Sequence, residues 1–519
     1  MAKKPQVPKL RDIMTKKAFM RISSVGYANQ GTTIDGNVSD NDRPLWQVVS
    51  QADFLREYYP SGHAINDPFY YPDRQKIDPV SKKILIEKVI RCSFPFQKVI
   101  TTKQVIHLCG NDIRFELTEL KETEKQKETF FKLKKGWQLK HTEAAWFNCA
   151  LSAKVTGEAA IVGYINKGVF GWRTFSYLAG DKLYPQFDEF GKLMLFAREY
   201  KSYDEEGNAS TSFVEVWDSN KYSLYKRPLK GVGGIISEIK EAFQLQGYVL
   251  VKSDNHGFDN IPVAYYRNDD GACWSDSQDS IDKYELAVSH LCQNNMAYAF
   301  PILFLKGDDI TIQGGEDIYR PVKAITGDKD SNADYLTNPD GSASFELQLK
   351  ILLQNIFMGS FTVLPPELKS GDLPGVAVKL LYSPAIEKAM ADASQFDSFI
   401  ADIVNIFAHG YGLEIGEMTA MKNLKINSWI EPYVHQNIAE LMQNLQVGVF
   451  GGFLSKETAS EAAYYSKADE WYRIMKQQNA MDAEDAREVE NVGAEIPQTQ
   501  QPPQPPQPPI DNQAKANVE

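Results

Sequence analysis

The fold is decided by residues 344–411, which read SFELQLKILLQNIFMG (344–359), then LPPELKSGDLPG (364–375), then GVAVKLLYSPAIEKAMADASQFDSFIADIVNIFAHGY (375–411). The first and last segments have the apolar character of helices, and the middle one has the composition of a loop. A short loop between two helices is held at a fixed position. We therefore interpret this loop as a part of the molecule that is presented to a target.

The last of these segments predicts a long helix with one buried face. Its apolar residues recur at gaps of 4, 3, 4, 3 and 4, which is the spacing along one side of an α-helix. They are Ala389, Ala393, Phe396, Ile400, Ile403 and Phe407. Pro384 lacks a backbone donor and crowds the preceding turn, so we expect a kink near the start of this helix.

The loop is stiff at one end and sharply turned at the other. Pro365 and Pro366 restrict the backbone, whereas Gly371 permits a tight turn. Asp372 can cap the helix that follows, and Pro374 falls in its first turn, where a missing N–H costs nothing.

A second predicted helix, residues 275–300, precedes this region. Its face is marked at gaps of 3, 4, 3, 4 and 3 by Ile281, Tyr284, Val288, Leu291, Asn295 and Tyr298. Between it and Ser344 lie short strand candidates and a polar loop, TGDKDSNADYLTNPDGSAS. Two helices that bracket a small module of strands and loops predict a stalk with a tip.

The region before the stalk predicts a mixed, antiparallel α+β structure. A helix is expected over residues 137–154 and a hairpin turn at Asp204–Asn208. The strand candidates are EAAIVGYINK, FGWRTFSYL, KLMLFAREY, SFVEVWDS, KYSLYKR and IPVAYYRN. The first 40 residues show little periodicity and predict an arm. The basic run at Lys121–Lys140 alternates with glutamates and is typical of a solvated helix face.

After the long helix, the chain predicts a strand, two helices and a tail. INSWIEPYV (426–434) has strand character, a helix is expected over 436–445, and Ser455 can cap another. The last 40 residues end in QPPQPPQPP, which has the period of polyproline II and predicts disorder. A proline-motif ligand is the alternative role for this tail.

Composition limits the possible functions. The 519 residues carry a formal charge of −12, which argues against a surface that simply coats nucleic acid. No window has the uninterrupted apolar length of a membrane span. The five cysteines lack CxxC spacing, so we expect free thiols and a reducing compartment.

Motifs for catalysis, cofactors and metals are not found. The glycines of KGVGGIIS (230–237) fit neither the dinucleotide nor the phosphate-loop spacing. His107 and Cys109, on one face of a probable strand, have no second ligand pair, so we favour core residues over zinc. One alternative stays open, a metal-dependent hydrolase built from dispersed residues such as Asp276, Asp279 and Asp282.

The order of these parts resembles the portal proteins of tailed bacteriophages. GEAAIVGYIN (157–166) and VEVWDSNKYSLYKR (214–227) look like the wing sheet, and DSQDSIDKYELAVSHLCQNN (276–295) looks like the entry to the first stem helix. LPGVAVKLLYSPAIEKA (373–389) is similar to the run from tunnel loop to tunnel helix, and FGGFLSKETASEAA (450–463) to the turn toward the crown. The basic insertion at 121–140 and the Pro/Gln tail depart from the pattern.

This resemblance implies an α+β portal fold with a defined order of parts. In this chain they would be an N-terminal arm (1–43), a wing (44–274), stem helix 1 (275–300), a clip (301–343), stem helix 2 (344–360), a tunnel loop (361–374), a kinked tunnel helix (375–411), a wing return (412–450), a crown (451–477) and a disordered Pro/Gln-rich tail (478–519).

The resemblance also implies a function without catalysis. It predicts a dodecameric ring at one capsid vertex of the virion, assembled in the host cytoplasm, through which double-stranded DNA is packaged, retained and ejected. The implied partners are the major capsid protein, the terminase large subunit and then a head-to-tail adaptor, with no membrane and no cofactor. Another viral ring or adaptor protein is the rival interpretation.

Two sets of candidate site residues follow from the resemblance. The DNA-facing loop would present Leu364, Pro365, Pro366, Glu367, Lys369, Ser370 and Gly371. The docking surface of the clip would present Asp328, Asp330, Asn332 and Asp334. Lys369 is the residue that would approach a DNA phosphate, although a lysine that only solvates a turn explains it equally well.

Overall fold

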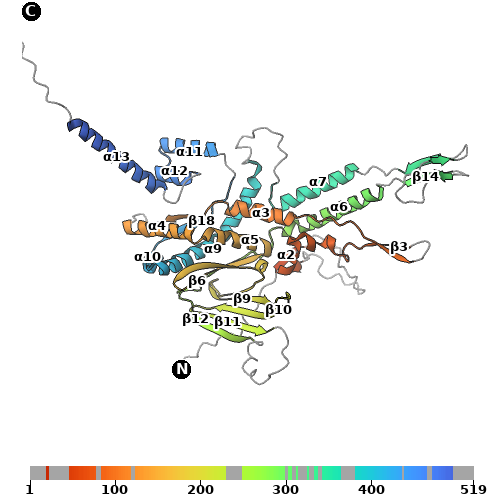
Figure 1. Ribbon diagram of the computed structural model, residues 1–519, viewed down its shortest axis with the longest axis horizontal. Coiled ribbons are helices and arrows are strands. Elements are labelled where there is room, and N and C mark those ends of the chain that lie inside the picture. The colour runs from red at the N-terminus through yellow and green to blue at the C-terminus, as the bar shows by residue number, and fades with distance from the viewer. Residues whose placement is uncertain are drawn as a thin grey trace, which may run out of the picture. The chain divides into compact units, whose positions relative to one another are not determined.

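The computed structural model describes most of the chain. The described residues are 19–22, 46–77, 83–118, 123–228, 248–298, 302–306, 311–313, 324–326, 332–336, 342–363, 380–434, 438–463 and 470–494. The chain forms two compact units, Met1–His435 and Gln436–Glu519. Helices and strands are mixed in the first unit (Figure 1), as the sequence predicts for an α+β protein.

Two antiparallel sheets form the strand-rich part of the first unit. The larger has the order β12–β11–β10–β9–β8, with the bounds Val249–Asn255, Lys221–Pro228, Ala209–Trp217, Leu193–Tyr203 and Lys182–Phe187. The smaller has the order β13–β6–β7, with the bounds Val263–Arg267, Glu158–Asn166 and Val169–Phe175. Each of the six strand candidates between residues 157 and 268 contains an observed strand, and residues 204–208 join β9 to β10 as expected.

Helix α9 (Ser383–Ile415) runs through the main hydrophobic core and packs on the smaller sheet. Five of the six residues of its predicted face are buried, and Ala393 packs against the same core. The helix meets the sheet closely: a Cβ on Gly410 would lie 2.2 Å from the Phe170 ring, and one on Gly163 would lie 2.5 Å from Ile406. These glycines therefore set the distance between helix and sheet.

The start of α9 lies where the sequence predicts a kink. Residues 380 and 381 are helical, Tyr382 forms a turn, and α9 begins at Ser383 with Pro384 in its first turn, so the helical chain is interrupted beside this proline. The helix continues past residue 411 to Ile415 and ends at Gly416, whose φ of 74° is in the left-handed region that glycine tolerates.

The helices that cover α9 were only partly predicted. The basic run forms α4 (Glu124–Leu139) and the expected helix over 137–154 begins later, as α5 (Thr142–Thr156). Leu133 and Trp137 of α4 are buried in the main core, so this segment is not merely a solvated face. Its lysines reach acids at the end of α9: Lys140 Nζ lies 2.8 Å from Glu414 Oε1.

The segment around His107 is a helix, α3 (Phe96–Cys109), where the sequence suggested a strand. The run KVITTKQVIHLC is rich in β-branched residues, which favour strands in isolation. Packing overrides that preference, because Ile100, Val105 and Leu108 are buried from one side of the helix.

Two helices form a pair that ends at the strands between them (Figure 1). They are α6 (Gln278–Tyr298) and α7 (Ser342–Gly359), which pack against each other. The described strands between them are β14 (Ile302–Lys306), β15 (Thr311–Gln313), β16 (Ala324–Thr326) and β17 (Asn332–Leu336). β14 pairs with β17 and β15 pairs with β16, both antiparallel.

Polar side chains on α6 hold an extended segment along the helix. Three amides of that segment, two residues apart, donate to three side chains of α6 that are four residues apart. The bonds are Ile90 N to Gln293 Oε1 (3.0 Å), Cys92 N to Ser289 Oγ (2.9 Å) and Phe94 N to Glu285 Oε1 (2.7 Å). Two residues of extended chain span about 6.6 Å and four helical residues about 6 Å, so the two repeats match.

The same face of α6 buries an ionic pair. His63 Nδ1 lies 2.7 Å from Glu285 Oε1, and both side chains are fully buried. His63 Nε2 lies 2.7 Å from the backbone oxygen of Glu57, which can only accept, so Nε2 carries a proton. Burial alone would lower the pKa of His63, but the hydrogen bond and charge of Glu285 raise it overall.

Several short elements complete the first unit. Within the expected N-terminal arm, β1 (Phe19–Ile22) pairs with β2 (Trp46–Val49), and Phe19 is buried against Phe54. The remaining strand pairs are β3 (Arg74–Ile77) with β4 (Ile84–Glu87) and β5 (Arg114–Leu117) with β18 (Ile426–Trp429). The other helices are α2 (Gln51–Tyr58) and α10 (Met418–Lys422), and short 3-10 turns occupy Pro60–Gly62, Ala64–Asn66, Tyr177–Ala179 and Ser275–Ser277.

The described residues of the second unit form helices α11 (Ile438–Phe450), α12 (Lys456–Ala462) and α13 (Glu470–Ala494). Ser455 caps α12 as predicted, with its Oγ 3.0 Å from Thr458 N. Helix α13 continues through residues 478–494, which the sequence analysis assigned to a disordered tail. The reason is local, because QNAMDAEDAREVE is rich in good helix formers and its prolines begin only at Pro497. None of the helices in the described residues is both long and apolar enough to cross a membrane.

Asp282, in the first turns of α6, should make the free energy of unfolding of the protein decrease as the pH rises. Burial, together with the charges of Glu57 and Glu285, raises the pKa of Asp282 to about 7, although Gln278 and His63 oppose this shift. The folded chain therefore holds this proton more tightly than the unfolded chain, and loses stability as the pH rises toward 7. The raised pKa of His63 acts in the same direction above pH 6.5.

The difference in free energy of unfolding between Asp282→Asn and the wild type should consequently shift in favour of the variant by about 2 kcal/mol when the pH is raised from 5 to 8. Thermal denaturation at both pH values measures this difference. Asp279→Asn is the matched control, because Asp279 forms a surface pair with Lys283 at 2.6 Å. A stability gap for Asp282→Asn that is equal at both pH values would contradict the prediction.

Candidate functional site

The predicted site residues lie largely outside the described residues. The whole predicted loop set, Leu364–Gly371, falls there, as do Asp328 and Asp330. Asn332 and Asp334 are on β17, where the register places them opposite Lys306 and Phe304 of β14. What the structure does describe is the framework to which residues 364–379 are attached, namely the end of α7 and the start of α9.

The end of α7 is built by a helix-terminating motif with an aromatic residue in an unusual position. Thr362 N donates to Phe357 O at 2.9 Å and Phe361 N donates to Met358 O at 3.1 Å, the two bonds of a Schellman motif. Phe361 has φ 51°, where glycine is the usual residue, at a cost of about 1 kcal/mol. Phe361 is 48% exposed, so about half of its surface is not covered by the rest of the structure.

The end of α7 is anchored to the turn before α6. Ser277 Oγ donates to Ile356 O at 2.8 Å, and a Cβ on Gly359 would lie 2.9 Å from that hydroxyl oxygen. Ser360 and Thr362 are buried. The stem-like pair α6 and α7 is therefore joined at its base by a hydrogen bond that requires close approach.

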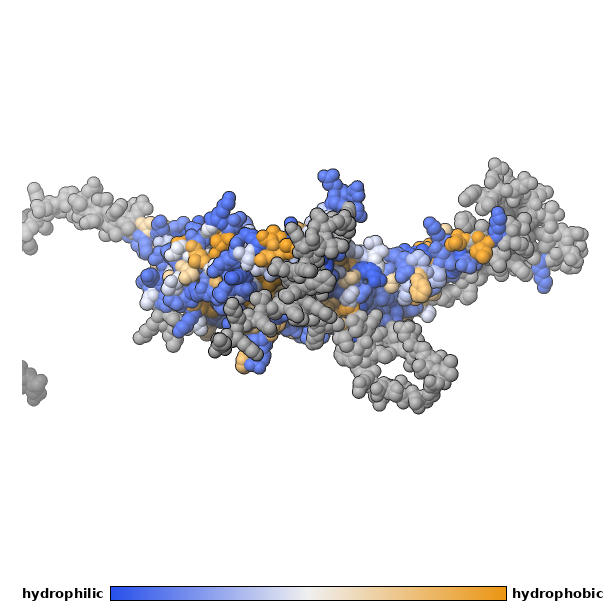
Figure 2. Space-filling view, turned by 90° about the horizontal axis from the view of Figure 1, so that it is seen from below, coloured by the Kyte–Doolittle hydropathy of each residue, from blue (hydrophilic) through white to orange (hydrophobic). Residues whose placement is uncertain are grey.

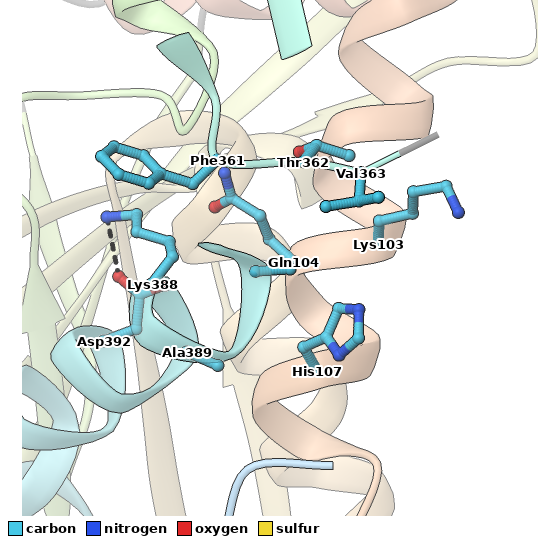
Figure 3. A pocket seen from close by; sticks show the side chains of 10 residues that line it. Lys103, Gln104, His107, Phe361, Thr362, Val363, Lys388, Ala389 and Asp392 are labelled. Carbon is cyan, nitrogen blue, oxygen red and sulfur yellow. Dashed lines mark ion pairs between the residues drawn. The ribbon is translucent and has the colours of Figure 1, made fainter. Parts of the chain in front are cut away.

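A shallow pocket lies between the end of α7, helix α3 and the first turns of α9 (Figure 3). Gln104 and Lys388 point toward the segment that carries Phe361, and a dashed line marks the ion pair from Lys388 to Asp392. Asp392 is the only acid among the residues that line this pocket in the described chain, whereas Lys103, His107 and Lys388 supply the basic groups.

The aspartates of the hydrolase alternative do not converge. Asp279 pairs with Lys283, and Asp282 accepts a hydrogen bond of 2.8 Å from Gln278 Nε2. Across the described part of the chain, no three His, Cys, Asp or Glu side chains gather closely enough to hold a metal ion. These carboxylates lie at or near the N-terminus of α6, where the helix dipole stabilises negative charge.

The sequence did not single out the polar residues that build this framework. Lys154 and Asp392 each stand between two apolar residues, whereas Gln104 follows the polar run Thr101–Lys103. A charged residue inside an apolar helical face was the available signal, because such residues are rarely buried unless paired.

The described residues thus form a helix pair, a base to which residues 364–379 are attached, and two antiparallel sheets. A family model described as phage portal protein, SPP1 Gp6-like, matches residues 45–490. Since the match spans most of the chain, the protein belongs to the SPP1 Gp6-like family of phage portal proteins, which are virion components of the head–tail connector. A search of curated proteins found no match.

Proposed function

We propose that the chain is the subunit of a ring, by family resemblance a dodecamer, that occupies one capsid vertex and forms the channel for packaging, retaining and ejecting double-stranded DNA. The observation that carries this proposal is the family match over residues 45–490. The ring would assemble in the host cytoplasm and bind the major capsid protein. It would hydrolyse no nucleotide itself, so that packaging energy comes from the terminase.

The observed elements support the proposed order of parts. The two sheets would be part of the wing, α6 the first stem helix, the strands β14–β17 the clip, and α7 the second stem helix. Residues 361–374 would be the tunnel loop, α9 the tunnel helix, and helices of the second unit the crown. Helix α11 belongs to the second compact unit, which begins at Gln436, while the wing return (412–450) and the crown (451–477) stay as proposed.

An exposed apolar stripe on α7 supports a ring. Leu347, Ile351 and Met358 follow helical spacing and are 59%, 46% and 73% exposed. Apolar patches also interrupt the hydrophilic face in Figure 2. A stripe of this kind in a single chain exposes surface that association would bury, and cyclic symmetry supplies the same neighbour to every subunit.

Ile351→Glu should therefore weaken ring assembly, because it places a charge in the proposed interface between subunits. Gln348→Glu is the control, since Gln348 is exposed on α7 but lies off the stripe. Mass photometry across a wide concentration range measures the assembly. Wild-type protein that remains monomeric or dimeric would refute the ring, and intact Ile351→Glu rings would refute this interface.

The loop at Leu364–Gly371 is the proposed narrowest part of the channel, with Lys369 closest to the DNA phosphates. One lysine from each subunit would attract DNA locally, while the overall charge of −12 would limit tight binding. Attraction without arrest suits a channel through which DNA must move in both directions.

Lys369→Glu should leave rings intact but reduce the length of packaged DNA or its retention, because it replaces attraction by repulsion. Lys192→Glu, an equal change of charge at an exposed wing turn, is the control. Gel analysis of DNA from purified particles measures both properties. Particles of Lys369→Glu with normal DNA length and retention would leave the loop as a steric constriction at most.

The clip at residues 301–343 is the proposed docking surface for the terminase large subunit and later for a head-to-tail adaptor. Asp328 and Asp330 lie between β16 and β17 in the sequence, so their charges can be reversed without removing a strand. Asn332 and Asp334 belong to the same proposed surface.

Asp328→Lys with Asp330→Lys should abolish binding of the adaptor while rings still form. Glu206→Lys, in an exposed turn of the wing, is the control. Cosedimentation of rings with the adaptor measures the interaction. Normal binding by the doubly substituted ring would place the docking surface elsewhere.

A further inference from the structure

A buried ionic network lies at the start of α9. Asp392 is 2% exposed and its Oδ2 lies 2.5 Å from Lys154 Nζ of α5, which is 7% exposed. Its second oxygen, Oδ1, lies 3.0 Å from Lys388 Nζ. Two lysines thus share one carboxylate inside the protein.

The network continues to the end of α7 through Gln104 of α3. Lys154 Nζ donates to Gln104 Oε1 at 3.3 Å, and Gln104 Nε2 donates to the backbone oxygen of Ser360 at 2.7 Å. The amide of Gln104 is oriented by a donor on one side and an acceptor on the other. Its contact with Ser360 therefore depends on Lys154, which in turn is held by Asp392.

Both attachment points of residues 364–379 are held by these contacts. Ser360 lies just before that segment, and Asp392 belongs to the helix that follows it. The contacts join residues that are 238, 50 and 256 positions apart in the sequence. Polar contacts thus join α3, α5, α9 and the residue that follows α7. Elsewhere, α5 and α9 contact each other through aromatic rings, such as those of Trp146 and Phe396.

Stability does not explain the choice of charged residues. Apolar side chains of similar volume often stabilise a core as well as a buried ion pair does, because the pair loses its hydration. Hydrogen bonds and ion pairs differ from apolar contacts in that they fix direction and distance. A network with this property suits a place where two chain segments must keep a fixed separation.

We propose that Lys154, Asp392 and Gln104 are positioning residues that hold the two attachment points of residues 364–379 at a fixed separation. In the ring, this fixed base would let the loop resist the passage of DNA. That second part rests on the proposed function of the loop, whereas the fixed separation does not.

Two variants test the proposal in the full-length protein. Gln104→Met removes the hydrogen bonds of this side chain to Ser360 and to Lys154, but it keeps the Lys154–Asp392 ion pair and a side chain of similar volume. Lys154→Met with Asp392→Leu replaces the ion pair by apolar residues. The control is Lys140→Met with Glu414→Gln, which removes another Lys–carboxylate pair of α9, far along the helix from the loop.

Hydrogen exchange, read by mass spectrometry, supplies the first measurement. The amides of Phe361 and Thr362 close the end of α7, so their exchange reports whether this attachment point is held. We expect exchange about tenfold faster there in both test variants, with unchanged midpoints of thermal denaturation and no change in the control. Wild-type exchange rates in Gln104→Met would overturn the proposal, as would an equal acceleration in the control.

DNA retention by particles that carry the same variants supplies the second measurement. Faster exchange together with leakage of DNA supports both the fixed base and the proposed role of the loop. Faster exchange with normal retention supports the positioning residues and refutes the role of the loop in resisting DNA. If the double variant does not assemble, Gln104→Met alone decides the first question.

Discussion

Burial of the apolar face of α9 is the constraint on which the first unit depends. Phe396, Ile400 and Phe407 are completely buried, and helices and sheet strands from distant parts of the sequence must reach them. Burial of side chains of this size contributes about 1.5–3 kcal/mol each. The smaller sheet, α3 and α4 pack on this one helix, and α5 contacts it through Trp146 and Phe396, so the position of α9 determines theirs.

Polar contacts then fix how far each segment is shifted along the helix on which it packs, because apolar burial alone does not fix this position. Leucine or phenylalanine can slide along an apolar surface at little cost, but a buried donor that loses its acceptor costs about 1–3 kcal/mol. The extended segment at residues 90–94 is fixed along α6 in this way. At the other end of the helix pair, Ser277 and Gln104 fix the end of α7 by hydrogen bonds to backbone oxygens.

The family assignment and the described geometry both direct attention to the base of residues 364–379. In the framework around residues 364–379, the buried carboxylate of Asp392 is paired with Lys154 and Lys388. Its unusual features are Phe361 in a left-handed conformation at the end of α7 and the buried Lys154 of α5, which reaches Ser360 through Gln104. Buried polar contacts of this kind fix the positions of the segments that they join.

The sequence by itself determined the α+β class, six strands of the wing, the buried face of α9 and the helix pair around a small strand module. Each of these depends on periodicity within one segment, which is visible without a partner. It predicted a strand where α3 forms, because β-branched residues favour strands in isolation and only tertiary packing overrides that preference.

Only the tertiary structure decided which charged and polar residues are buried and what they contact. Glu285 and Gln293 of α6 lie outside the apolar face that the sequence predicted, and yet both are buried. Lys154 and Asp392 are 238 residues apart and become partners only when α5 packs on α9. The physical reason is that a buried charge is stable only with a specific partner, and the sequence records the charge but not the approach of the partner.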